Sequence, residues 1–180
     1  LWQGYAGMVD EIAAAGPKPG AVVLCVGGGG LLCGVIEGLH RNNWADVPIV
    51  AVETEGAESF ALSVREGRLV ELDAITSIAT SLGARQVCSQ AFMWSKTHPV
   101  KNVVVSDKAA VAACERFIED HQVVVEPACG ASLAAVYDNV PELAPFSSVL
   151  VIVCGGVTST IAQLQEWSKN FEERAGASKY

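Results

Sequence analysis

Residues 21–39 read AVVLCVGGGGLLCGVIEGL and join three kinds of sequence in one order. The first part, Ala21–Val26, is an apolar run of strand length. Four consecutive glycines, 27–30, come next. Apolar residues then recur at the spacing of one helix face: Leu32, Val35, Ile36 and Leu39. A buried strand that leads through a glycine loop into a helix is typical of proteins with a parallel sheet.

The same alternation of strand and helix continues outward from this stretch in both directions. Further strands are expected at 48–53, 102–105, 123–126 and 148–153. Helices are expected at 6–15, 31–42, 57–66, 86–97, 107–120, 127–140 and 159–171. The sequence therefore predicts a three-layer α/β fold, with an open, mostly parallel sheet and helices on both faces. Residues 1–171 are expected to form one domain and residues 172–180 a polar tail.

Composition excludes several classes of protein. The 180 residues include 12 Lys and Arg against 20 Asp and Glu, for a formal net charge of −8. This balance argues against nucleic acid or an anionic membrane as the main partner, and no apolar run approaches the ~20 residues that cross a bilayer. Six cysteines without a C-x-x-C pair are too dilute for a disulfide scaffold. Free thiols in the cytoplasm are the expectation.

The glycine loop, Gly27–Gly30, is the strongest functional feature. Glycine is costly in chain entropy, and a plain turn needs only one or two. Four glycines before a helix indicate that backbone N–H groups approach an anionic ligand closely, and phosphate fits best. The loop lacks the G-x-G-x-x-G pattern of dinucleotide sites and the Gly-Lys-Ser/Thr of P-loops. The alternative is a turn that serves only close packing of strand and helix.

Two other positions at strand ends are candidates for a site. Cys154 and Gly155 follow the last strand, where ligands of parallel sheets bind, although a free Cys there can equally be a small buried hydrophobe. Glu53 ends an apolar strand, where a charge is costly unless it is paired. Its carboxylate either helps to bind a hard cation or caps the helix that follows.

Four motifs in order carry a resemblance to a known family: GGGGLLCGV (27–35), PIVAVET (48–54), EPACGA (126–131) and VIVCGG (151–156). They resemble the serine dehydratase family of fold-type II pyridoxal-phosphate enzymes, over about residues 1–164. The resemblance implies a large domain like that of tryptophan synthase β and a cytoplasmic homodimer that acts in amino-acid metabolism and gluconeogenesis. It implies dehydration of L-serine, and less readily L-threonine, to a 2-oxo acid and ammonia. Cys rather than Ser at position 154 favours the serine branch over threonine dehydratases.

The resemblance also implies roles for individual residues. Gly27–Gly30 and Leu31 correspond to the loop that binds the phosphate of pyridoxal 5'-phosphate. Cys154, with Gly155, corresponds to the partner of the pyridine nitrogen. A monovalent cation, K⁺ or Na⁺, is implied at a site that draws on five residues: Gly27, Glu53, Ala57, Ser59 and Leu82.

One part of the family pattern is absent from this sequence. The Schiff-base lysine of the family lies in a Ser-x-Lys-x-Arg-Gly segment upstream of the glycines, but the lysine found there is Lys18, in a Pro-Lys-Pro-Gly turn. We therefore expect the chain to be the C-terminal part of a longer enzyme, without a catalytic residue of its own and inactive alone. The alternative is a non-catalytic domain of the same fold that binds a phosphate ligand or regulates.

Overall fold

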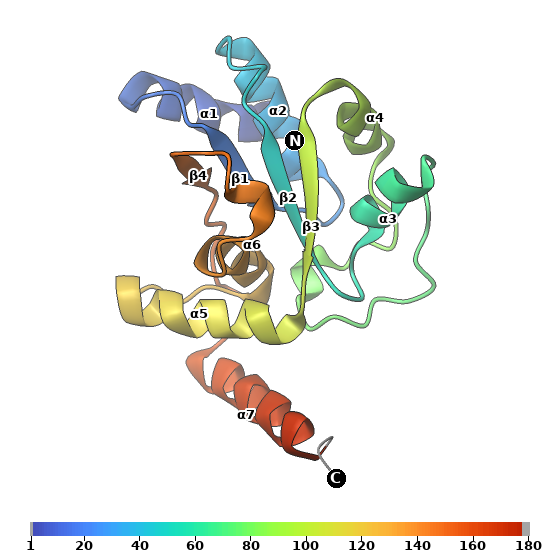
Figure 1. Ribbon diagram of the computed structural model, residues 1–180, viewed down its shortest axis with the longest axis vertical. Helices are drawn as coiled ribbons and strands as arrows, with labels where there is room; N and C mark the ends of the chain where they lie inside the picture. The colour runs from blue at the N-terminus through green and yellow to red at the C-terminus, as the bar shows by residue number, and fades with distance from the viewer. Residues whose placement is uncertain (1, 178–180) are drawn as a thin grey trace.

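A single parallel sheet forms the centre of the molecule. The computed structural model describes residues 2–177 and contains a four-stranded sheet in the order β3-β2-β1-β4 (Figure 1). These strands are β1 (Ala21–Cys25), β2 (Ile49–Thr54), β3 (Val100–Val105) and β4 (Val149–Val151). All three neighbouring pairs are parallel, and Val23 of β1 is aligned with Val50 of β2 and Val151 of β4. The predicted parallel α/β sheet is confirmed.

Helices cover both faces of this sheet, as predicted. One face packs against α1 (Trp2–Ala15), α2 (Gly30–Arg41), α3 (Ser59–Glu66) and α4 (Ser89–Thr97). The other packs against α5 (Asp107–His121), α6 (Pro127–Tyr137) and α7 (Ile161–Ala177) (Figure 1). Because side chains alternate along a strand, Val22 and Leu24 of β1 join the first core and Val23 and Cys25 join the second. Two short 3₁₀ turns lie at Thr80–Leu82 and Pro141–Leu143.

Two glycines of α2 bring α1 unusually close to it. A Cβ at Gly38 would lie 2.7 Å from Val9 Cβ and 2.8 Å from Ala6 O, and a Cβ at Gly34 would lie 2.7 Å from Trp2 O. Only glycine permits this approach of backbone to backbone. As a result, the first turns of α1 lie beside the start of α2, at the carboxyl end of β1.

Several local predictions differ from the structure. Residues 123–126 are irregular rather than a strand, because their backbone lies beside the loop after β4, where Glu126 N donates to Gly155 O at 3.0 Å, and not beside a strand. Strand β4 is shorter than the predicted 148–153.

The expected helix ends also move. Helix α6 ends at Tyr137, before the expected Val140. Helix α7 continues past Phe171 to Ala177, because Glu172, Glu173 and Arg174 are good helix formers even where they are exposed. The last residues of the predicted polar tail, 178–180, lie outside the described part. Within residues 2–177, each helix is too short or too polar to cross a membrane.

Candidate functional site

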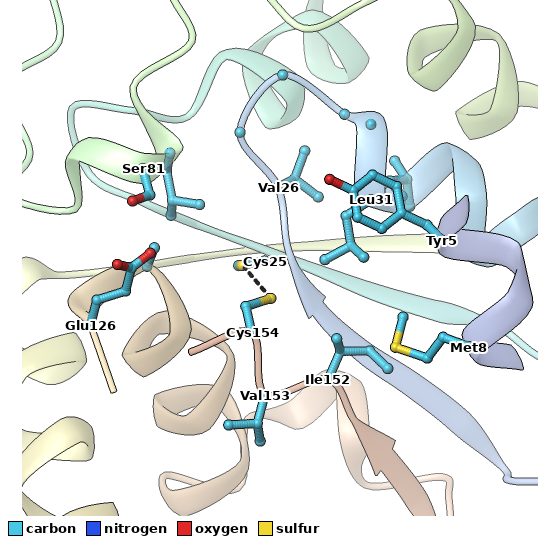
Figure 2. A pocket seen from close by; sticks show the side chains of 17 residues that line it. Tyr5, Met8, Cys25, Val26, Leu31, Ser81, Glu126, Ile152, Val153 and Cys154 are labelled. Atoms are coloured by element: carbon cyan, nitrogen blue, oxygen red, sulfur yellow. Dashed lines mark hydrogen bonds between the residues drawn. The ribbon is translucent and has the colours of Figure 1, made fainter. Parts of the chain in front are cut away.

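A cavity of about 530 Å³ opens at the carboxyl ends of β1 and β4. Figure 2 shows the side chains that surround it. Its lining includes all five residues of the predicted phosphate loop, Gly27–Leu31, together with Cys154. Gly155 is outside the lining but adjoins it. The structure therefore brings together two segments that are far apart in the sequence, as the position of both at strand ends predicted.

The glycine loop has a backbone shape that requires glycine at one position above all. Gly29 is the N-cap of α2 and has φ 87°, a left-handed conformation. A Cβ there would lie 2.6 Å from Ala91 Cβ and 2.9 Å from Val87 Cγ2. At Gly28, by contrast, the nearest atom to a Cβ would be Ala84 Cβ at 3.9 Å, so this residue adjoins open space in the cavity.

The start of α2 is suited to an anion. The first N–H groups of any helix lack acceptors within the helix, and no side chain caps α2. The positive end of the helix dipole adds to the attraction for negative charge. Backbone N–H groups beside an open cavity are the usual means of binding a phosphate group. The loop thus lies at an uncapped helix start beside the cavity, and the phosphate site stays a prediction.

Cys154 lies in the irregular segment after β4 and is exposed. Its Sγ is 3.9 Å from the Sγ of Cys25, the last residue of β1, and the two side chains point toward one another (Figure 2). A hydrogen bond from the Cys25 thiol lowers the pKa of Cys154, although burial opposes this effect. Cys154 is therefore not an inert core thiol. It presents a polarised sulfur to the same cavity as the glycine loop.

Glu53 is fully buried at the end of β2 and binds the start of α3. Its Oε1 accepts from Phe60 N at 2.8 Å and its Oε2 from Ala61 N at 2.7 Å. Burial raises the pKa of Glu53 to about 7, and these two hydrogen bonds act against that rise. The helix-capping alternative is therefore observed, although the capped helix begins at Ser59 and not at Ala57.

Some of the other residues of the expected cation site lie close together. A Cβ at Gly27 would lie 3.1 Å from Leu82 Cα, so these two residues are in contact. Ser59 Oγ is buried and has no hydrogen-bond partner among the described residues. Within residues 2–177 no cluster of three or more His, Cys, Asp and Glu side chains could hold a metal ion. A cation here would depend on backbone carbonyls, which leave little trace in a sequence.

Several residues of the cavity were not predicted from sequence. Tyr5 and Met8 come from α1, and Ser81 from the Thr80–Leu82 turn (Figure 2). Glu126 also lines the cavity, and its carboxylate accepts from Thr158 Oγ1 and from Thr158 N. The only sequence feature that marks Glu126 is its place in the EPACGA motif, which by itself suggested a plain junction.

No lysine of residues 2–177 lines the cavity. Lys18, the lysine upstream of the glycines, forms an ion pair with Asp46 at 2.6 Å on the surface. Among the described residues, the lining of this cavity therefore includes no lysine amine that could bind an aldehyde covalently.

Comparison with known proteins agrees with this geometry. The family model for pyridoxal-phosphate dependent enzymes matches residues 1–155. The chain belongs to this family. An L-serine dehydratase/L-threonine deaminase of Bos taurus is 50% identical over 173 residues, which are 91% of this chain and 53% of that protein. The chain thus spans about half the length of the curated relatives it matches.

Two solved structures of the family share the fold. A fungal L-serine ammonia-lyase from Rhizomucor miehei superposes with a TM-score of 0.88 at 40% identity, over 93% of this chain and 56% of that one. A maize serine racemase superposes with a TM-score of 0.81 at 25% identity, over 94% and 54% of the two chains.

The residues present fit pyridoxal phosphate. The glycine loop leaves space where a Cβ at Gly28 would otherwise project, which suits close approach of a phosphate to backbone N–H groups. Cys154 offers a thiol to a weakly basic ring nitrogen across the same cavity. In a member of this family, the glycine loop would hold the phosphate of the cofactor and Cys154 would hold its ring nitrogen.

Proposed function

We propose that this chain forms the cofactor-binding part of an L-serine (L-threonine) dehydratase, a lyase that converts its substrate to pyruvate (2-oxobutanoate) and ammonia. One observation carries the proposal: an uncapped helix N-terminus behind four glycines and a strand-end thiol face one cavity. The sequence identity of 50% to a serine dehydratase and of 40% to a serine ammonia-lyase supports this dehydration reaction among the reactions of the family. The substrate is a small amino acid, and we expect the full-length protein to be a cytoplasmic homodimer.

The residues of this chain divide the work of binding. The N–H groups of Gly28, Gly29 and Gly30 hold the phosphate, and Leu31 lies in the first turn of α2, whose dipole assists them. Cys154 holds the ring nitrogen. Tyr5 and Met8 close one side of the cavity and help to exclude water.

The choice of Cys at position 154 suits elimination. Bound pyridoxal phosphate supplies an electron sink for bonds broken at the substrate's α-carbon. A thiol at the ring nitrogen keeps its proton on sulfur, whereas a carboxylate would favour a proton on the ring. Cys154 thereby leaves the ring less electron-withdrawing. Prompt loss of the β-hydroxyl is favoured over transamination, which needs a longer-lived carbanion.

The proposal also includes a bound monovalent cation, K⁺ or Na⁺. Glu53 would neutralise it, the carbonyls of Gly27, Ala57 and Leu82 would surround it, and Ser59 Oγ would complete the shell. The buried Ser59 oxygen without a protein partner supports this site, because such an atom costs free energy unless something binds it.

A non-catalytic role is the second candidate, and the cavity without a lysine favours it. In that case the chain would bind a phosphate ligand, or regulate, without turnover. Pyruvate release from L-serine by the full-length protein supports the dehydratase. Tight binding of pyridoxal phosphate by that protein without pyruvate supports the non-catalytic role.

Titration of the chain with pyridoxal phosphate, followed by absorbance, tests the glycine loop directly. Gly28→Val should weaken binding at least ~10-fold, about 1.4 kcal/mol, because the added side chain enters the phosphate space. Gly16→Val is the matched control, since a Cβ there also has its nearest atom at 3.9 Å and lies just after α1, outside the cavity lining. Pyridoxal, which lacks the phosphate, should bind both variants and the parent chain equally weakly. Unchanged affinity in Gly28→Val would refute the phosphate loop.

A further inference from the structure

Two thiols meet in the cavity although 129 positions separate them in the sequence. Cys25 is the last residue of β1, and Cys154 lies just beyond β4, the strand beside it in the sheet. Their sulfur atoms are 3.9 Å apart, with the side chains directed at one another (Figure 2). A disulfide has an S–S length of about 2.05 Å. Bond formation therefore requires a movement of only about 2 Å.

Cys154 is free to make that movement. The strand ladder beside it ends with the hydrogen bond from Ile152 N to Val23 O, so Cys154 itself is outside the sheet. The next residue, Gly155, has φ 137°, and no atom lies within 4 Å of the position of its Cβ. Cys154 is exposed to solvent, whereas Cys25 is 7% exposed and fixed in β1. One thiol is accessible and lies outside the sheet, and the other is in place to react with it.

The two thiols also have different acidities. The hydrogen bond from Cys25 lowers the pKa of Cys154. The same hydrogen bond, together with burial, raises the pKa of Cys25 well above its ordinary value. Since the thiolate is the form that reacts with oxidants, Cys154 is the sulfur that is oxidised first, and Cys25 is the thiol that resolves the product.

A second thiol pair in the molecule shows that proximity is not enough. Cys33 and Cys88 have the same sulfur–sulfur separation, 3.9 Å. Cys33, however, is 1% exposed inside α2, and burial raises its pKa to about 12. Its partner Cys88 is half-buried, so neither thiol of this pair is exposed as Cys154 is. This pair is therefore a natural control for Cys25 and Cys154.

We propose that Cys25 and Cys154 form a reversible disulfide when a peroxide oxidises the protein, and that this disulfide closes the cofactor site. The second part rests on the proposed function, because it assigns Cys154 to the ring nitrogen of pyridoxal phosphate. Intracellular disulfides of this kind are transient and redox-sensing rather than structural.

The chemistry balances with hydrogen peroxide as the two-electron oxidant. The Cys154 thiolate attacks one peroxide oxygen, which forms a sulfenic acid and releases hydroxide. The Cys25 sulfur then attacks the Cys154 sulfur and forms the S–S bond. The sulfenic oxygen takes the Cys25 proton and leaves as water, and the hydroxide released in the first step takes up the proton that the Cys154 thiol lost on ionisation. Two thiols and one peroxide thus give one disulfide and two waters. A dithiol reductant reverses the reaction by exchange.

The disulfide removes what the cofactor needs from Cys154. A sulfur bonded to Cys25 carries no proton to donate to a ring nitrogen. The glycine loop is unaffected, so a phosphate can still bind there. Oxidation should therefore weaken pyridoxal phosphate binding far more than binding of inorganic phosphate.

Peptide mapping tests the disulfide without reference to function. The reduced chain is treated with equimolar hydrogen peroxide, alkylated, digested and analysed by mass spectrometry. The expected main product joins the Cys25 peptide to the Cys154 peptide. In Cys25→Ser, Cys154 should instead accumulate as a sulfenic acid that dimedone traps, whereas the matched variant Cys33→Ser should form the Cys25–Cys154 disulfide as the parent does. A dominant Cys33–Cys88 crosslink, or over-oxidised Cys154 without a crosslink, would overturn the proposal.

Titration of the reduced, oxidised and re-reduced chain with pyridoxal phosphate tests the consequence. Oxidation should weaken binding at least ~10-fold, and a dithiol should restore it. If the oxidised chain, with its disulfide shown by mapping, binds pyridoxal phosphate as tightly as the reduced chain, then the disulfide does not control the site. If the reduced chain does not bind pyridoxal phosphate at all, the proposed function fails, while peptide mapping still decides whether the disulfide forms.

Discussion

The N-termini of α2 and α3 follow neighbouring strands of the sheet, yet they satisfy their N–H groups in opposite ways. Helix α3 receives the chain's own anion, because the buried Glu53 carboxylate accepts from Phe60 N and Ala61 N. Helix α2 begins with Gly29 as N-cap and has no side-chain cap. An anion site is therefore available at α2 and already filled at α3. The comparison shows that the N–H groups at the start of α2 are left without a side-chain acceptor, whereas those of α3 have one.

The difference also bears on the proposed cation. Both carboxylate oxygens of Glu53 are engaged by N–H groups, but each retains a further lone pair. A cation that uses them would offset the burial that now raises the pKa of Glu53. The filled helix terminus would then serve to fix a cation ligand, whereas the open one serves to bind phosphate.

The largest effect is expected from Glu53→Ala. The change leaves the N–H groups of Phe60 and Ala61 without an acceptor, at about 1–3 kcal/mol each, and should lower the free energy of unfolding by roughly 2–6 kcal/mol. Urea denaturation followed by circular dichroism measures it. Glu66→Ala, at the exposed end of the same helix, is the control and should change stability by less than ~0.5 kcal/mol. Similar losses in both variants would mean that Glu53 does not fill the terminus of α3.

A slightly smaller loss is expected from Gly29→Ala. The new Cβ would collide with Ala91 and Val87 and would force a non-glycine residue to keep φ 87°. Strain and overpacking together should cost roughly 2–4 kcal/mol of stability. Gly28→Ala meets no close atom and should unfold at nearly the parent's urea midpoint. Equal stability of the two variants would show that the loop does not require the observed backbone.

The smallest expected effect is a change of stability with pH. It comes from Glu53 at the N-terminus of α3, and the N-terminus of α2 has no side-chain cap that could produce it. Because the pKa of Glu53 is raised to about 7 in the folded state, the folded chain keeps a proton that the unfolded chain has lost. The contribution of this proton to stability is fully present below the pKa of the unfolded state, about 4.3, and is lost as the pH rises through 7. The parent should therefore lose roughly 1–3 kcal/mol relative to Glu53→Gln between pH 5 and 8. Parallel stability profiles of the two proteins would contradict the raised pKa.

Sequence was a good guide wherever a local pattern was sufficient. Three adjacent patterns predicted β1, the loop and α2: the run Ala21–Val26, the four glycines and the apolar face from Leu32 to Leu39. Each pattern could be interpreted alone, because the spacing of its apolar residues or glycines depends on its own local structure. Ser106, just before the expected helix 107–120, is a residue type that caps helices, and its Oγ accepts from Ala109 N at the start of α5. The strand expected at 123–126 is wrong, because a strand needs a partner and the pattern of one segment does not contain it.

The sequence by itself determined the alternation of strands and helices, the glycine loop and the strand-end positions of Glu53 and Cys154. Those features depend on spacing, backbone freedom and hydrophobicity, which are properties of neighbouring residues. Only the tertiary structure decided that Glu53 caps α3, that Tyr5, Ser81 and Glu126 line the cavity, and that Cys25 meets Cys154. These contacts join distant segments, and they exist because parallel strands place their carboxyl ends along one edge of the sheet. That edge is fixed by the order of the strands, which no single stretch of the chain encodes.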